Sequence, residues 1–204
     1  MKSIKLKSMI ITCILCLLPI IPGIVLWDKL PEKIAIHFNI YGEPDNYWNK
    51  GFVVFLLPFI MAVFQAVCSL IYDLNSDKQR AGKRLIYISK GIIPVMSILL
   101  CSLTYLYSLG GISDIRCIIA IFVGALLVVM GFGIMDSESV NGLKVDSVTA
   151  KRINRLMGIL TMIMGGLMML TILLPPSAMV IWLLLLFPYI LIPLVYGLAI
   201  SKRK

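Results

Sequence analysis

The chain has 204 residues, of which 60% are hydrophobic and 14% are charged, and its formal net charge at pH 7 is +9. A water-soluble domain could not hide this much apolar surface in one core, and the charges stand in short stretches between long apolar runs. The composition argues against direct nucleic-acid binding, because no soluble folded element is present to carry a basic surface.

Apolar windows of about twenty residues, each long enough to cross roughly 30 Å of hydrocarbon as an α-helix, follow one another along the chain. They cover residues 9–27, 52–72, 91–109, 117–135, 156–174 and 179–200. The sequence therefore predicts an all-α integral membrane protein, a bundle of about six transmembrane helices. Prolines inside the first and last windows predict kinks there. We expect a two-span unit at 1–72 and a four-span unit at 73–204.

The first window resembles a secretory signal, because three lysines precede its apolar stretch. Pro19, Pro22 and Trp27 stand where the small residues of a cleavage site would be needed. We therefore expect an uncleaved anchor. Cys13 and Cys16 have the C-x-x-C spacing of redox and zinc sites, but inside an apolar window we expect them to be free thiols, like the other cysteines.

Residues 28–50 form the longest predicted connection outside the membrane. From Ile34 to Ile40 every second residue is apolar, which is the pattern of a half-buried β-strand. Residues 41–45 are rich in turn formers, and Trp48 follows where a tryptophan suits the headgroup region. We expect a short strand, then a turn, then a return to the membrane surface.

The positive-inside rule predicts the orientation of the spans. With the N-terminus in the cytoplasm, 15 of the 19 Lys and Arg residues fall on the cytoplasmic side. The four on the outer side are Lys29, Lys33, Lys50 and Arg116. Both termini are therefore predicted to be cytoplasmic.

Basic residues in the two cytoplasmic connections are candidates for contacts with lipid headgroups or with an acidic cytoplasmic partner. These residues are Lys83, Arg84, Lys151, Arg152 and Arg155. Ser147 is predicted to cap the helical turn that carries the last three.

Small and weakly polar residues recur at helical spacing in the second and third windows, and two glycines lie seven residues apart in the fifth. The residues are Ala62, Gln65, Ala66 and Ser69; Ser97, Cys101, Thr104 and Ser108; and Gly158 and Gly165. Such stripes let membrane helices approach closely. For the two polar stripes, a polar lining along a substrate path is the alternative interpretation.

The inventory of reactive side chains argues against catalysis. The chain has one histidine, His37, and no ionisable residue in the middle of any apolar window. His37, Glu43 and Asp45 could be imagined as a metal site, but carboxylates are also ordinary residues of a polar turn. We predict a protein that is not an enzyme and has no metal and no cofactor.

The connection at 28–50 contains, in order, Leu30, Pro31, His37, Phe38, Asn39, Gly42, Glu43, Pro44, Asp45 and Lys50. This pattern resembles the outer-loop signature of the SdpI-like bacterial membrane proteins, and the resemblance extends over the first two spans. The resemblance implies an immunity protein of the bacterial cytoplasmic membrane that protects its cell from a secreted membrane-active peptide. In its best-known form the family also holds a cytoplasmic repressor at the membrane.

We therefore assign a candidate ligand-binding site to this connection, on the only outer segment long enough to fold. Its residues are His37, Phe38, Asn39, Gly42, Glu43, Pro44, Asp45, Trp48 and Lys50. The predicted partners are the lipid bilayer, a secreted toxin peptide and a cytoplasmic repressor. A small membrane transporter and a scaffold subunit of a membrane complex remain the alternatives.

Overall fold

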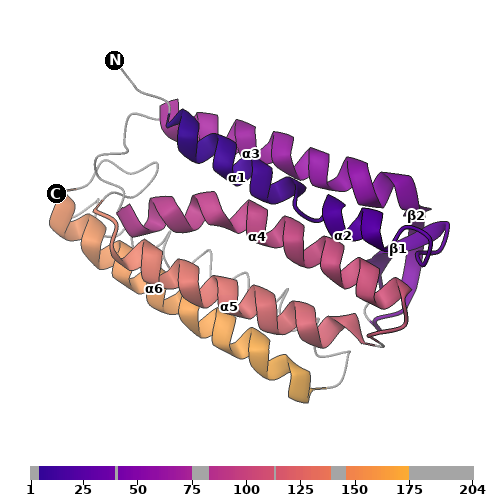
Figure 1. Cartoon of the computed structure of the whole chain (residues 1–204). Coiled ribbons are helices and arrows are strands. Elements are labelled where there is room, and N and C mark those ends of the chain that lie inside the picture. The colour runs from indigo at the N-terminus through magenta and orange to yellow at the C-terminus, as the bar shows by residue number, and fades with distance from the viewer. Residues whose placement is uncertain (1–4, 40, 75–82, 113, 139–145, 175–204) are drawn as a thin grey trace. The chain divides into compact units, whose positions relative to one another are not determined.

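The computed structural model describes residues 5–39, 41–74, 83–112, 114–138 and 146–174 (Figure 1). The chain forms two compact units. Unit 1 comprises Met1–Asn75 with Lys90–Arg116, and unit 2 comprises Ser76–Ser89 with Cys117–Lys204. The predicted boundary at residue 72, between a two-span unit and a four-span unit, stays a prediction.

Within the described residues, five helical segments are long and apolar enough to cross a membrane, which confirms the predicted all-α multi-pass architecture. They are Leu6–Val25, Phe52–Leu74, Arg84–Ser108, Ile115–Met135 and Ser147–Leu173. The sixth predicted span, at residues 179–200, lies outside the described residues.

The first span is broken, as its prolines predicted. Helix α1 (Leu6–Leu17) ends just before Pro19, and α2 (Ile20–Val25) follows it (Figure 1). Proline has no N–H to donate within the helix, so carbonyls near the break need other partners. In unit 1, α4 (Lys83–Ser108) supplies them. Ser97 Oγ donates to the carbonyl of Cys16 over 2.8 Å, and the Tyr105 hydroxyl donates to that of Pro19 over 3.3 Å.

The second span consists of η1 (Phe52–Leu56), a π-helical turn, and α3 (Leu57–Leu74). The polar stripe predicted on α3 turns inward, because Ala62, Gln65 and Ser69 are buried. The stripe predicted on α4 does the same at Ser97, Cys101 and Thr104. These faces therefore pack within unit 1, as the first of the two interpretations predicted.

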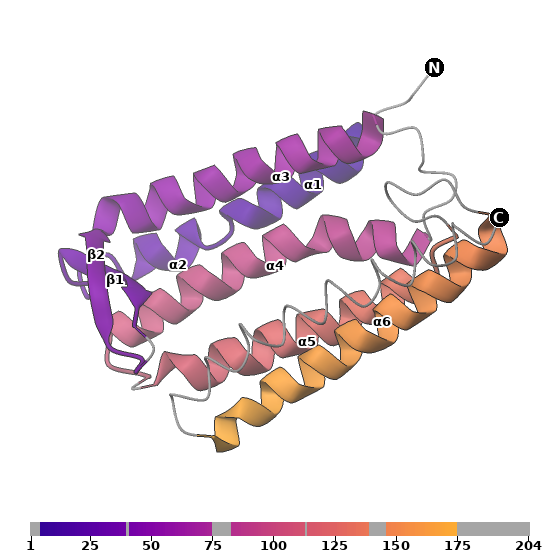
Figure 2. The same ribbon diagram turned by 180° about the vertical axis from the view of Figure 1, so that it is seen from behind.

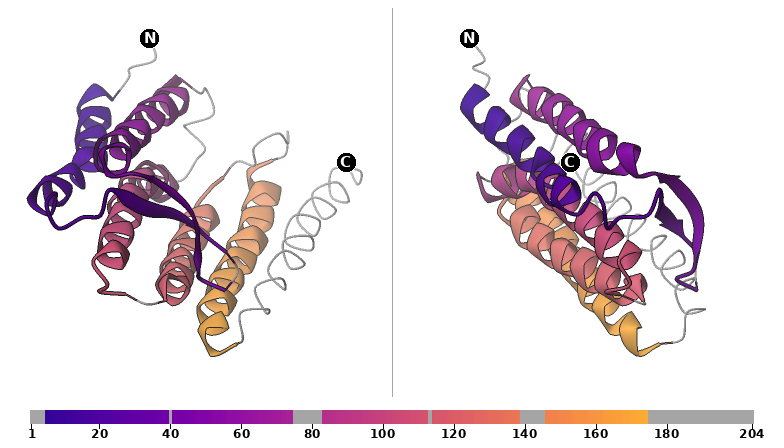
Figure 3. Two further views of the ribbon diagram at one scale, coloured as in Figure 1. Left: turned by 90° about the vertical axis from the view of Figure 1, so that its right-hand side faces the viewer. Right: turned by 45° about the vertical axis from the view of Figure 1, so that its right-hand side comes forward.

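The outer connection contains two strands where the sequence indicated one. Strand β1 (Lys33–Phe38) pairs antiparallel with β2 (Pro44–Asn49), with register irregularities near His37. We call residues 33–49 the outer hairpin (Figures 1 and 3). The second strand was missed because its first residues, Pro, Asp and Asn, are poor strand formers and good turn formers.

The outer hairpin is anchored to the helices of unit 1 through β1. Ile34 is fully buried and joins a core with residues from the second and third spans and from the connection itself. The other buried members are Leu30, Val53, Val54, Cys101 and Tyr105. The alternation that predicted β1 therefore reflects this anchoring, with His37 on the exposed side.

In unit 2, α5 (Ile115–Met135) and α6 (Ser147–Leu170), which is followed by η3 (Thr171–Leu173), run side by side (Figure 2). A Cβ atom added to Gly158 would lie 2.6 Å from the carbonyl oxygen of Gly131, and one added to Gly165 would lie 2.4 Å from that of Gly124. The close packing predicted for the glycines of α6 is confirmed. The cap was predicted one residue too late: Asp146, not Ser147, precedes the helix, and its carboxylate accepts the N–H of Thr149.

Candidate functional site

Two side-chain pairs join the strands at the tip of the outer hairpin. His37 Nδ1 lies 2.5 Å from Asp45 Oδ1, and Asn39 Nδ2 donates to Glu43 Oε2 over 3.1 Å. His37, Glu43 and Asp45 are exposed, whereas Asn39 is half-buried. Four polar residues of the candidate site are therefore brought together at the turn.

Asn39 also shapes the turn between the strands. Its Oδ1 accepts the backbone N–H groups of Tyr41 and Glu43 over 2.9 and 3.0 Å, and its own N–H donates to the carbonyl of Glu43 over 2.9 Å. Gly42 completes the turn with a φ of 83°, a conformation that side chains with a Cβ rarely adopt. The turn formers of the signature thus have a structural role that follows from their chemistry.

Arg116, at the start of α5, packs against this turn. A Cβ atom added to Gly42 would lie 2.8 Å from Arg116 Nε. The same guanidinium donates to both carboxylate oxygens of Asp114, over 3.0 and 2.8 Å. These hydrogen bonds from Arg116 lower the pKa of the Asp114 carboxyl. Arg116 was not among the predicted site residues; its only signal in the sequence was an isolated basic residue on the outer side.

Lys50 closes the base of the outer hairpin. Its Nζ lies 2.9 Å from Glu32 Oε1 and 4.9 Å from the centre of the Trp27 ring. The backbone repeats the contact, because the N–H of Lys50 donates to the carbonyl of Glu32 over 2.9 Å. The charge of this lysine is thus already engaged within unit 1, in an ion pair and a cation–π contact.

The remaining predicted site residues lie along the two strands. The Phe38 ring stands edge-on to Tyr107 at 4.8 Å between centroids, and Pro44 pairs with Phe38 across the ladder. Trp48 pairs with Ile34, and its ring centroid lies 6.5 Å from that of Phe52. Every predicted residue of the loop therefore belongs to the hairpin or to its base.

Strand β2 offers an exposed edge. Its residues from Asp45 to Asn49 are all exposed, and among the described residues β1 is its single partner strand. The N–H of Lys50 points toward the β1 side, so by the alternation of an antiparallel ladder the N–H of Tyr47 points away from it. Such an edge can pair with another extended chain.

An apolar groove of about 560 Å³ adjoins the C-terminal end of β2. It is lined by Leu17, Ile20, Asn49, Gly51, Phe52, Phe55, Leu56 and Phe59. The groove thus lies within unit 1, where the break in the first span faces the π-helical turn of the second. Its walls are aromatic and aliphatic, with polar groups only at the hairpin end.

No group of three or more His, Cys, Asp or Glu side chains that could hold a metal ion occurs among the residues that the structure describes.

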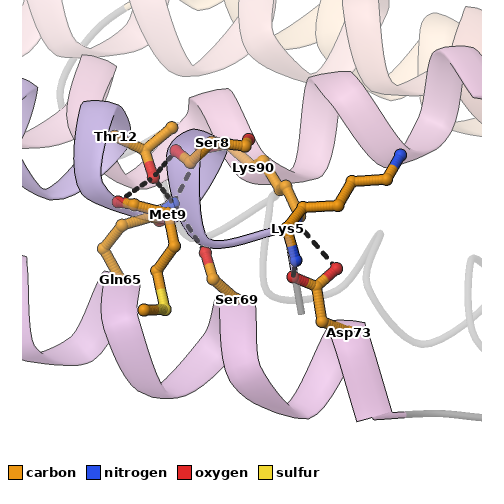
Figure 4. A network of polar contacts seen from close by, with 8 residues as sticks. All are labelled: Lys5, Ser8, Met9, Thr12, Gln65, Ser69, Asp73 and Lys90. Carbon is orange, nitrogen blue, oxygen red and sulfur yellow. Dashed lines mark hydrogen bonds and ion pairs between the residues drawn. The ribbon is translucent and has the colours of Figure 1, made fainter. Parts of the chain in front are cut away.

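A buried polar network joins the other ends of the first three spans (Figure 4). Asp73 is 3% exposed and Lys90 is 6% exposed, and they form an ion pair of 3.0 Å. The backbone N–H of Lys5 donates to the second carboxylate oxygen of Asp73 over 3.0 Å. About two turns further along α3, Gln65 Nε2 lies within hydrogen-bonding distance of Thr12, Ser69 and the carbonyl of Lys90.

Sequence analysis missed this network. Asp73 and Lys90 each adjoin the end of an apolar window, and Lys90 was counted only among the basic residues of the cytoplasmic side. In the structure Lys90 lies in α4 and is buried. Burial of one charge without the other would be costly, so the pair ties α3 to α4.

The predicted basic residues of the cytoplasmic side all lie in the segments of unit 2. Arg84 Nη1 lies 3.2 Å from Asp136 Oδ2, and Lys151 Nζ lies 2.8 Å from Glu138 Oε1. The hydrogen bond from Lys151 lowers the pKa of Glu138. Arg152 and Arg155 are exposed on α6. Lys83 begins α4, and its side chain lies outside the described part of the chain.

Comparison with known proteins agrees with the resemblance found in the outer loop. The family model "Domain of unknown function (DUF1648)" matches residues 14–62, which hold the outer hairpin. The chain is similar to the immunity protein SdpI of Bacillus subtilis (strain 168), with 26% identity over 133 residues. The match covers 65% of this chain and 62% of that protein, so the chain spans less than two thirds of its relative's length. No solved structure matches the chain. The predicted similarity to SdpI-like proteins is confirmed.

Proposed function

We propose that the chain is a non-enzymatic immunity protein of the bacterial cytoplasmic membrane, which protects its cell by recognising a secreted membrane-active peptide at the outer hairpin. The observation that carries the proposal is the exposed edge of β2, held in place by a strand that is anchored in the core of unit 1. The similarity to an immunity protein supports the class of function.

A preformed strand edge suits an extended peptide because the main chain supplies the hydrogen bonds. Each backbone N–H and C=O that points away from β1 is a donor or acceptor for a third strand. Preorganisation lowers the entropic cost of binding, and the hairpin has it through Ile34 in the core and the Asn39 turn. Protection thus requires an intact turn as well as an open edge.

The apolar groove at the end of β2 extends the proposed site into the membrane. A peptide that acts on membranes carries apolar side chains, and the groove is lined by Phe52, Phe55 and Phe59. The proposed division of roles is therefore that β2 pairs with the peptide backbone while the groove receives apolar side chains. Relay of the peptide's presence to a cytoplasmic repressor remains a prediction from the resemblance alone.

The test uses two variants at one exposed position. Tyr47→Pro and Tyr47→Ala both remove the tyrosine side chain, but only proline removes the N–H that points away from β1. The chain is expressed in a sensitive bacterium, which is challenged with a panel of secreted membrane-active peptides while survival, leakage and membrane abundance are measured. We expect protection from at least one peptide, retained by Tyr47→Ala and lost by Tyr47→Pro at equal abundance.

A second pair of variants separates recognition from support of the turn. If the carboxylates of Asp45 and Glu43 contact the peptide, Asp45→Ala and Glu43→Ala abolish protection at unchanged abundance. If those side chains only hold the turn, abundance and protection fall together. Failure of the wild-type chain against every peptide would contradict the immunity role, and full protection by Tyr47→Pro would contradict pairing at the edge.

A further inference from the structure

We infer that α6 carries an anionic-phospholipid site formed by Arg152 and Arg155, on the face that it turns to the bilayer at its N-terminal end. The inference concerns unit 2 alone and is independent of the proposed immunity role. It starts from the distribution of charge among the described residues of that unit.

The acidic side chains described in unit 2 are all engaged by other residues. Asp136 pairs with Arg84, Glu138 pairs with Lys151, and Asp146 caps the first turn of α6. The ion pairs found within the described part of the unit are these two, and neither involves Arg152 or Arg155. Two guanidinium groups three residues apart on a helix lie side by side. Together they suit an anion that binds both of them.

The position of the two arginines on the helix identifies the kind of anion. One stripe of α6 is exposed from end to end: Val148, Arg152, Arg155, Ile159, Ile163 and Leu170 follow at spacings of three, four and seven residues. The opposite stripe, which includes Asn154 and Gly158, is buried. The arginines thus stand on the face whose isoleucines are 40% and 52% exposed and meet hydrocarbon.

A group that is anionic and located at the edge of the hydrocarbon is a phospholipid headgroup. Guanidinium binds phosphate oxygens in a bidentate manner, and a juxtamembrane Lys or Arg contributes on the order of fivefold to the affinity for anionic lipid. Two arginines therefore predict a preference of roughly 25-fold for an anionic over a zwitterionic lipid at low salt. An acidic protein segment could bind arginines on any exposed face of α6. The position of these two arginines on the apolar, lipid-facing stripe therefore favours a lipid.

The test measures binding of phosphatidylglycerol and phosphatidylcholine to the purified full-length chain in detergent, by native mass spectrometry across a lipid titration. The double variant R152Q/R155Q is compared with K151Q, a matched control, because Lys151 lies on the same helix but is paired with Glu138. We expect the wild type and K151Q to prefer phosphatidylglycerol by about 25-fold, and the double variant to prefer it by less than about twofold. The thermal unfolding midpoint in phosphatidylcholine should be the same for all three, because the substituted side chains are exposed.

Charge-retaining and salt controls sharpen the result. R152K/R155K should keep most of the preference. Raising the salt concentration should weaken the preference in every variant that shows it and leave R152Q/R155Q unchanged. Equal affinity of the wild type for both lipids would overturn the inference and point to a soluble acidic partner. A preference that survives in R152Q/R155Q, or that K151Q loses to the same extent, would overturn it as well, because the charge would then act without a defined site.

Discussion

A methyl group added at Gly158 should separate α5 from α6, whereas the same group added at Gly166 should do nothing. Both glycines lie on α6. A Cβ at position 158 would lie 2.3 Å from Met135 Cγ and 2.6 Å from the carbonyl oxygen of Gly131, but no atom lies within 4 Å of a Cβ at position 166. The variants Gly158→Ala and Gly166→Ala therefore make the same chemical change, but only the first one disturbs the packing of the helices.

The magnitude follows from the distances. The methionine side chain can move, but the carbonyl of Gly131 belongs to a helix backbone, so relief requires the helices to part. Ordinary contact begins near 3.4 Å, which is about 0.8 Å beyond the 2.6 Å available. A gap of this size forfeits a quarter to a half of each contact's attraction, and overpacking of this kind typically costs about 1–3 kcal/mol. Alanine favours a helix over glycine by up to about 1 kcal/mol at both positions. This gain partly offsets the packing loss at position 158 and remains as a net gain at position 166.

The assay is unfolding of the purified chain in mixed micelles titrated with sodium dodecyl sulfate, followed by near-ultraviolet circular dichroism. Gly158→Ala should lower the free energy of unfolding by about 1–2 kcal/mol net, and Gly166→Ala should leave it unchanged or raise it slightly. Equal midpoints for the two variants would refute the reasoning, because they would mean that the close approach at Gly158 does not hold the helices together.

Three further predictions test other parts of the chain. Asp73→Asn should lower the free energy of unfolding by about 3–5 kcal/mol by leaving Lys90 buried without its partner, whereas the double variant D73L/K90L should lose less; an equal loss would show that the ion pair does not act as a unit. Because its arginine partner lowers the pKa of Asp114, the stability from this carboxylate is present above the unfolded-state value near 3.8 and is lost as pH falls through the lower folded value. The unfolding midpoints of wild type and Asp114→Asn should therefore differ at pH 7 and converge below about pH 4, and a constant difference would exclude this linkage. In a background without native cysteines, a cysteine at Asn46 should react with an impermeant thiol reagent added to intact cells, whereas one at Gln79 should react only when the reagent reaches the cytoplasmic side. Labelling of position 79 from outside would reverse the orientation.

In the outer hairpin, the local sequence pattern determines one strand and tertiary structure determines the other. Strand β1 could be predicted because two of its alternating apolar residues, Ile34 and Ile36, pack in the core. Strand β2 could not, since Pro44 and Asp45 disfavour strands and its residues are extended through pairing with β1. Arg116 was missed as a contact of Gly42 because more than seventy residues separate them.

The sequence by itself determined the features that depend on the solvent. Hydrocarbon excludes charges and requires backbone hydrogen bonds to be made within each helix, so apolar windows specify the spans, and Pro19 specifies the break in the first. The turn at Asn39 and Gly42 is likewise local chemistry. Only the tertiary structure decided which charges meet: Asp73 and Lys90 look like two exposed residues at the ends of windows until α3 packs against α4 and buries both within one ion pair. Such a pairing depends on the packing of helices, which no local pattern of residues encodes.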